Sequence, residues 1–115
     1  MKKFNLIIDG KQVSTNDYFD VINPADKSVV ARCPKASVEQ LNTAVAAAKA
    51  AFPSWSALTY AERRDYLMQL ADAVEADSEA FMTMLTKEQG KPLKGFADLG
   101  AGFELGGTLA WIRAT

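Results

Sequence analysis

The stretch SVEQLNTAVAAAKAAF, residues 37–52, decides the fold class of this chain. Its large and small apolar residues recur at spacings of three and four, the period of one helix face: Val38, Leu41, Val45, Ala48 and Phe52. Ser37 followed three residues later by Gln40 has the form of a capping box. We therefore predict a helix after Ser37, and we expect Pro53 to stop it, because a proline disfavours helical backbone at the residue before it.

Before this helix the pattern is that of short strands. Residues 6–8 are apolar, the short segment 11–13 ends in Val13, and Asp9-Gly10 separates the two. An Asp-Gly pair tolerates the two positive φ angles of a type I′ turn, so it predicts a β-hairpin.

A second strand pair is predicted at residues 18–22 and 29–33. Between them stands Asn23-Pro24-Ala25-Asp26, in which proline presets its φ and the Asn23 side chain can bond its own backbone. We expect Pro34 to end the second strand.

Helical spacing returns after Pro53. Thr59 and Glu62 form a second capping box, followed by an apolar stripe. The stripe comprises Tyr66, Leu67, Leu70, Ala71 and Val74, and Phe81, Met84 and Leu85 continue it. Asp77-Ser78 is expected to break or re-cap this helix, and Gly90 with Pro92 beyond it is a helix stop.

The last part of the chain is rich in glycine. Residues 95–107 hold five glycines and predict a loose connection, which enters a final helical run over about residues 103–113. The chain reaches Thr115 without a stop signal, so we expect it to be cut from something longer. The fold class predicted is an α+β fragment in a single piece: β-hairpins in residues 1–34, then three to four α-helices in residues 37–115.

Composition excludes several classes of function. The chain has 115 residues, no histidine, one cysteine and a formal net charge of −1. Without histidine there can be no Ser-His or Cys-His nucleophile, and a zinc site would have a poor ligand set. The balanced charge argues against a nucleic-acid surface. We expect a cytoplasmic protein, because no apolar run is long enough for a signal peptide or a membrane span.

Four groups of residues are candidate sites, and each has a simpler interpretation. Cys33 is next to Arg32, but on a strand their side chains point to opposite faces, so we predict a structural thiol. Glu75, Asp77 and Glu79 lie at a helix junction and are expected to be solvated.

The remaining candidates also favour a structural role. Gly100, Gly102, Gly106 and Gly107 fail the spacing of a dinucleotide fingerprint and follow a helix, which favours a turn with close helix packing. Trp55 and Trp111 are interpreted as core or interface anchors. The residues alone therefore predict no catalytic, cofactor or metal site.

Three stretches together resemble the NAD(P)-dependent aldehyde dehydrogenase superfamily, with semialdehyde dehydrogenases among its members. The first is IDGK (8–11) with YFDVINPA (18–25), the second VAAAKAAFPSW (45–55) with AERR (61–64), and the third EQGKPL (88–93) with FELGG (103–107) and AWIR (110–113). The resemblance runs the whole length of the chain, in the order and spacing of the family's N-terminal segment.

The resemblance implies a part of the α/β aldehyde dehydrogenase fold. In the complete enzyme a cysteine thiolate attacks the aldehyde, hydride passes to NAD or NADP, and a glutamate activates water to release the acid. All of these groups lie beyond the segment that this chain matches, so no site residue is carried over, and we expect no cofactor on this chain alone. The expected partners are the rest of the enzyme and a homo-oligomer, without nucleic acid or membrane.

A freestanding interaction module descended from that segment is the alternative. The reading frame that follows Thr115 distinguishes the two, because only the enzyme requires a cysteine motif and a dinucleotide site downstream.

Overall fold

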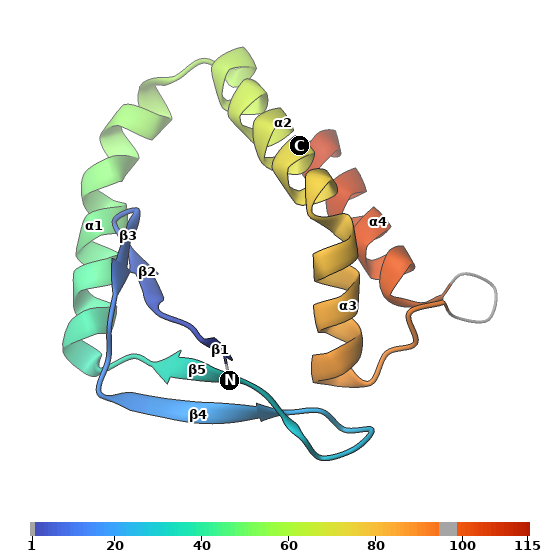
Figure 1. Ribbon diagram of the computed structural model, residues 1–115. Coiled ribbons are helices and arrows are strands. Elements are labelled where there is room, and N and C mark those ends of the chain that lie inside the picture. Colours follow the sequence, from blue (N-terminus) through green and yellow to red (C-terminus); the bar gives the residue numbers. More distant parts are fainter. Residues whose placement is uncertain (1, 95–98) are drawn as a thin grey trace. The chain divides into compact units, whose positions relative to one another are not determined.

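The computed structural model describes residues 2–94 and 99–115, which form five short strands and four helices (Figure 1). The strands are β1 (Lys2–Lys3), β2 (Leu6–Ile8), β3 (Lys11–Val13), β4 (Asp17–Ile22) and β5 (Val29–Lys35). The helices are α1 (Val38–Ala57), α2 (Tyr60–Ala76), α3 (Ser78–Gln89) and α4 (Ala101–Ala114). The predicted class, an α+β fragment of hairpins followed by helices, is confirmed.

Strands β2 and β3 form the predicted hairpin. They pair antiparallel, with Ile8 opposite Lys11. The two turn residues between them, Asp9 and Gly10, have φ angles of 53° and 70°. Both angles are positive, as a type I′ turn requires, so the turn predicted at Asp9-Gly10 is confirmed.

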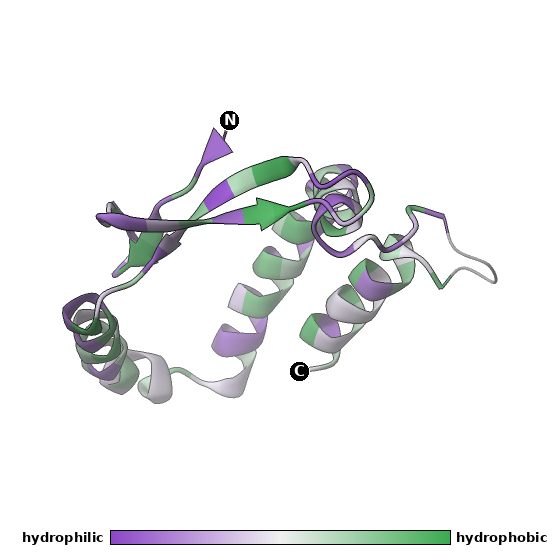
Figure 2. Ribbon diagram, turned by 90° about the horizontal axis from the view of Figure 1, so that it is seen from below, coloured by the Kyte–Doolittle hydropathy of each residue, from purple (hydrophilic) through white to green (hydrophobic). Residues whose placement is uncertain are grey.

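Strand β5 is the centre of a three-stranded sheet in the order β1-β5-β4. Strand β4 pairs with it antiparallel, and β1 pairs with it parallel, Lys2 lying opposite Ala31. Hydrophobic and hydrophilic residues mix along these strands (Figure 2). Strand β1 was not predicted, because two lysines carry no strand pattern; their place comes from the long-range pairing.

The prediction that Pro34 ends β5 was wrong. The strand runs on to Lys35, and Pro34 lies opposite Tyr18 of β4. Pairing with β1 stops at Arg32. Beyond that point one edge of β5 has no strand partner among the described residues, and a proline on such an edge breaks no ladder bond.

Helix α1 begins as predicted and ends later than predicted. Both halves of the capping box of Ser37 and Gln40 are present. Pro53, however, lies inside the helix, which continues to Ala57. The bias against helical backbone before proline is a tendency. Here the alanine-rich turns around Pro53 have high helix propensity and outweigh the one lost donor.

The later helices have the predicted ends, with one correction. Thr59 caps α2 through a complete capping box, Asp77 separates α2 from α3, and Gly90 closes α3 with a left-handed φ of 71°. The last helix, predicted over about residues 103–113, begins two residues earlier, at Ala101, so the glycine-rich connection ends before that position. Residues 95–98 of that prediction lie outside the described residues.

Contacts divide the chain into two compact units, and the division does not follow the change from strands to helices. The first unit comprises residues 1–22 and 27–58, so α1 belongs with the strands. The second comprises residues 23–26 and 59–115. No helix of the described residues is long and apolar enough to cross a membrane.

Within the first unit, α1 is covered on a face of small residues. It contacts β2, and its half-buried residues are Gln40, Ala44 and Ala47. The large apolar residues lie on another face and are mostly exposed: Val38 68%, Leu41 57%, Val45 59% and Phe52 65%. We call these four residues the outer face of α1. The helix therefore packs locally with small side chains and leaves the outer face uncovered.

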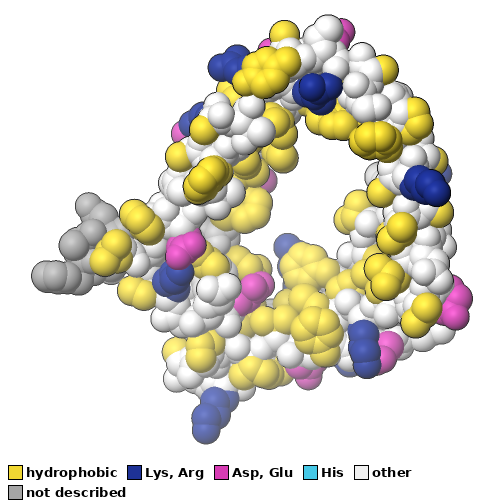
Figure 3. Space-filling view, turned by 180° about the vertical axis from the view of Figure 1, so that it is seen from behind, with side chains coloured by type: hydrophobic (Ala, Val, Ile, Leu, Met, Phe, Trp, Pro, Cys, Tyr) yellow, Lys and Arg dark blue, Asp and Glu magenta, His cyan; other side chains and the backbone are white. Residues whose placement is uncertain are grey.

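Within the second unit, α4 packs against both α2 and α3 (Figure 1). Its buried residues are Ala101 and Leu109, which meet a helix pair whose own buried residue is Ala71. Phe81, Phe103 and Trp111 are at least half exposed. Hydrophobic side chains are accordingly visible over much of the helical surface (Figure 3).

We predict that the 115-residue chain self-associates. Fully burying a large apolar side chain stabilises by roughly 1.5–3 kcal/mol, so any contact between copies that covers the outer face of α1 is favourable. Light scattering over a dilution series is expected to show mass rising with concentration. A constant mass of 12.5 kDa, with a melt independent of concentration, would contradict this.

Candidate functional site

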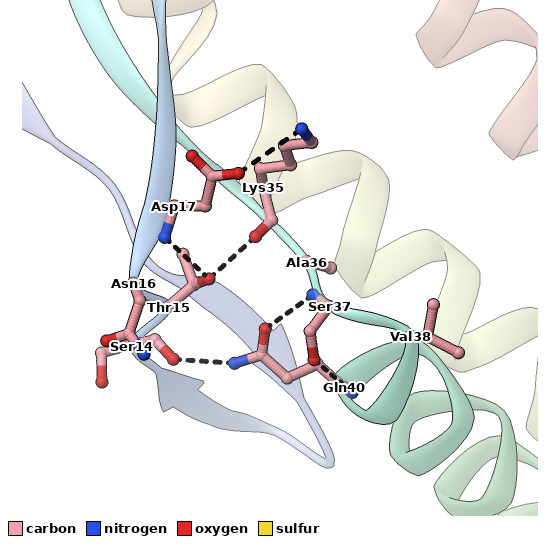
Figure 4. A pocket seen from close by; sticks show the side chains of 9 residues that line it. All are labelled: Ser14, Thr15, Asn16, Asp17, Lys35, Ala36, Ser37, Val38 and Gln40. Carbon is pink, nitrogen blue, oxygen red and sulfur yellow. Dashed lines mark hydrogen bonds and ion pairs between the residues drawn. The ribbon is translucent and has the colours of Figure 1, made fainter.

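One polar hollow lies where the loop before β4 meets the start of α1 (Figure 4). It is lined by Ser14, Thr15, Asn16, Asp17, Lys35, Ala36, Ser37, Val38 and Gln40. Residues of this kind can bind a small polar ligand only where their polar groups are not already hydrogen-bonded within the chain.

Gln40 is the central residue of this hollow. Its side-chain Oε1 accepts the Ser37 backbone N–H at 3.0 Å, and its Nε2 donates to the Ser14 carbonyl at 2.8 Å. Its own backbone N–H donates to Ser37 Oγ at 3.2 Å. One side chain thus completes the helix cap and ties α1 to the loop before β4.

The other polar groups of the hollow also bond one another. Thr15 Oγ1 donates to the Lys35 carbonyl at 2.8 Å and accepts the Asp17 N–H at 3.4 Å. The one acid and the one base, Asp17 and Lys35, form an ion pair at 3.4 Å. The hollow is therefore a joint that holds helix to sheet, in which these polar groups bond to one another.

A second hollow lies among α2, α3 and α4 and is mainly apolar. It is lined by Val74, Phe81, Met82, Leu85, Gln89, Ala101, Glu104, Leu105 and Thr108. Its one carboxylate, Glu104, forms an ion pair with Lys91. A lone paired carboxylate in an apolar groove does not make an acid–base site.

Cys33 lies on β5, half-buried and opposite Phe19 of β4. The guanidinium that precedes it in sequence is bound elsewhere: Arg32 Nε lies 3.1 Å from Asp20 Oδ1. A reactive thiol needs a cation, a helix N-terminus or a base beside it. The one cation adjacent in sequence is held by a carboxylate, which favours a structural role for Cys33.

The glycines near α4 do not form a phosphate-binding loop. Gly100 is the N-cap of α4, but the first amide of the helix, Ala101 N–H, donates to the Pro92 carbonyl at 2.9 Å. The Phe103 N–H donates back to Gly100 at 3.1 Å. Gly102 lies inside the helix, where an added Cβ would be 3.6 Å from Met82 Sδ. Amides that are already bonded offer little to a phosphate.

Of the acids at the α2–α3 junction, Glu75 forms an ion pair with α4. Glu75 accepts a hydrogen bond from Arg113 of α4 at 2.5 Å, and Arg113 also reaches Asp72 at 3.3 Å. The hydrogen bond and the charge of Arg113 lower the pKa of Glu75. Glu75 and Asp72 in turn raise the pKa of Arg113. Glu75 is thus an ionised partner for α4, and this pairing had no local signal in the sequence.

The two tryptophans are on the surface of the chain. Trp111 is 78% exposed and Trp55 41%. Both are therefore available as interface anchors, and that role stays a prediction. Within residues 2–94 and 99–115 no group of three or more His, Cys, Asp or Glu residues could hold a metal ion.

Comparison with known proteins gives a single family. The model of the aldehyde dehydrogenase family matches residues 11–101. A probable aldehyde dehydrogenase of a Pseudomonas species is 43% identical over 110 residues, which are 96% of this chain and 22% of the relative. The 5-carboxymethyl-2-hydroxymuconate semialdehyde dehydrogenase of Escherichia coli is 39% identical, over 81% of this chain and 20% of that enzyme.

Solved structures give the same result. The crystal structure of PnpE in complex with nicotinamide adenine dinucleotide has a TM-score of 0.86 at 36% identity, over 96% of this chain and 22% of that one. A salicylaldehyde dehydrogenase from Pseudomonas putida G7, complexed with salicylaldehyde, has a TM-score of 0.88 at 25% identity, over 99% of this chain and 23% of that one. The chain thus spans about a fifth of the length of the relatives that it matches.

We predict that Glu75→Gln weakens the second unit in a pH-dependent way. The folded-state pKa of Glu75 lies below its ordinary 4.5, so its stabilising effect is complete above about that pH and is lost as the pH falls through the lower folded value. Urea unfolding from pH 7 to pH 3 should show a gap between wild type and Glu75→Gln that closes at acid pH.

Glu79→Gln is the matched control for this measurement. Glu79 lies at the same junction and forms no ion pair within the described part of the chain. A pH-dependent gap of equal size for both variants would contradict the assignment.

Proposed function

The chain belongs to the aldehyde dehydrogenase family, and from this premise we propose that it is the N-terminal structural segment of an NAD(P)-dependent aldehyde dehydrogenase. The complete enzyme would oxidise an aldehyde to a carboxylic acid and reduce NAD or NADP. Semialdehydes are the first substrates to test, since relatives at 39% and 41% identity are named for muconate-type semialdehydes.

The outer face of α1 is the observation that supports this role. Four large apolar side chains on one helix are each more than half exposed, while the same helix packs on β2 with small residues. Exposed apolar patches of this kind mark surfaces that a partner covers. The relatives are about four times as long as this chain, and we propose that the remainder of such an enzyme is the partner.

Assembly and location are further parts of the proposal. We propose a homo-oligomer, for which exposed aromatic residues such as Trp111 are suitable anchors. We propose a cytoplasmic location, for which the single cysteine is the support, since the chain holds no second cysteine for a disulfide.

The described residues do not fit NAD or NADP. The glycine-rich start of α4 has its first amides bonded to Pro92 and Gly100, and its carboxylate Glu104 is paired with Lys91. A dinucleotide site instead needs free amides at the start of a helix that directly follows a strand. In this proposal the cofactor, the thiolate and the oxyanion donors belong to the rest of the enzyme, and this segment supports them.

We predict that the 115-residue chain neither binds NAD or NADP nor oxidises aldehydes. Calorimetric titration of the chain should give no binding, while the complete enzyme, run as the positive control, should bind the cofactor. Micromolar binding to the chain alone, about −8 kcal/mol, would show that a cofactor site was overlooked.

We predict that Leu41→Ala has different costs in the two contexts. In the isolated chain, diluted until light scattering shows a monomer, Leu41 is 57% exposed, and substitution of an exposed side chain costs less than about 0.5 kcal/mol. In the complete enzyme the same change should cost roughly 2–5 kcal/mol, as for a buried leucine. Chemical unfolding of both proteins measures the difference.

Thr43→Ala is the control for that comparison, because Thr43 is exposed on a different side of α1. Its cost should be equal in the two contexts. Equal costs for Leu41→Ala as well would contradict the proposed scaffold surface, whatever the enzyme's substrate.

A further inference from the structure

Two of the motifs that carry the family resemblance meet in space although they are more than sixty residues apart. The turn of residues 23–26, from the YFDVINPA stretch, groups by its contacts with α2, α3 and α4. Within this unit the Pro24 ring lies against Gly90, from the EQGKPL stretch. Neither motif has a part in the chemistry proposed above, so their meeting needs its own explanation.

Gly90 is required at its position for two separate reasons. It closes α3 in the left-handed conformation, with φ at 71°, and its N–H donates to the Thr86 carbonyl at 2.9 Å. Left-handed backbone by itself favours glycine. In addition, a Cβ added at position 90 would lie 2.9 Å from Pro24 Cγ, too close for two carbon atoms.

Both sides of this contact are held in place by other bonds. On the turn, Asn23 Oδ1 accepts the Ala25 N–H at 3.0 Å, and the proline ring limits the φ of Pro24. On the helix side, Lys91 forms an ion pair with Glu104, and the Pro92 carbonyl accepts the Ala101 N–H at 2.9 Å. The Pro24 ring and the Gly90 cap are therefore each held in position by bonds other than their mutual contact.

We propose that Pro24 and Gly90 form a clasp, an internal docking site in which the Pro24 ring occupies the space of the missing side chain at position 90. The clasp holds the Asn-Pro turn on the end of α3 and explains why the two motifs occur together. This inference does not depend on the proposed enzyme, since it concerns contacts within one compact unit of the chain.

The chain offers a matched control glycine. Gly10 has almost the same left-handed φ, 70°, but nothing lies within 4 Å of an added Cβ there. Gly10→Ala therefore introduces the backbone strain without the collision, whereas Gly90→Ala introduces both. Pro24→Ala removes Cγ and leaves only the Cβ, which lies 3.8 Å from the added atom, an ordinary contact.

The experiment is a double-mutant cycle on the 115-residue chain, with amide hydrogen exchange read at the end of α3 and in the Asp9-Gly10 turn. Gly90→Ala should lower the protection factors of the amides at the end of α3. Adding Pro24→Ala to that variant should raise those protection factors again by about fivefold or more, because it removes the overpacking. Gly10→Ala should lower protection at its own turn by a factor that Pro24→Ala does not change.

Each outcome decides the proposal. Recovery at position 90 without recovery at position 10 supports the clasp. If Gly90→Ala alone does not fold, refolding of the Pro24→Ala, Gly90→Ala double variant supports it equally. A loss at position 90 that is the same with proline or alanine at position 24, or a double variant that stays unfolded, overturns it.

Discussion

The constraint on which the rest of this structure depends is that α1 is covered mainly at its own small residues. The half-buried positions of the helix are Gln40, Ala44 and Ala47, two of them alanines, and the helix contacts β2. The same choice leaves the larger residues Val38, Leu41, Val45 and Phe52 without cover. Burial of large apolar side chains is the main source of stability. A chain arranged in this way has ordered local structure, but it buries few of its large apolar side chains.

The buried set in the described residues is correspondingly small. It comprises Ile8, Ala31, Ala71, Ala101 and Leu109. Three of these are alanines, which contribute little apolar area each. Polar joints carry much of the organisation instead, with Gln40 joining α1 to the loop before β4 and Arg113 joining α4 to α2. These joints position elements, but exposed ion pairs add little stability.

Most ion pairs of the described residues join elements that are distant in the sequence. The carboxylates that could have acted in chemistry, such as Asp17, Glu75 and Glu104, are each engaged by a lysine or an arginine. The amides at the start of α4 are bonded within the chain. These bonds join strands, loops and helices within each unit.

Local order in this protein could be predicted from sequence alone, because it depends on neighbours a few residues apart. The two capping boxes, the type I′ turn at Asp9-Gly10 and the glycine end of α3 are all of this kind. The proline rules failed at Pro34 and Pro53, since the outcome there depends on whether a strand partner is present and on the strength of the surrounding helix. Strand β1, the Arg113 pairings and the meeting of Pro24 with Gly90 were decided only by the tertiary structure, because each joins residues that no sequence period relates.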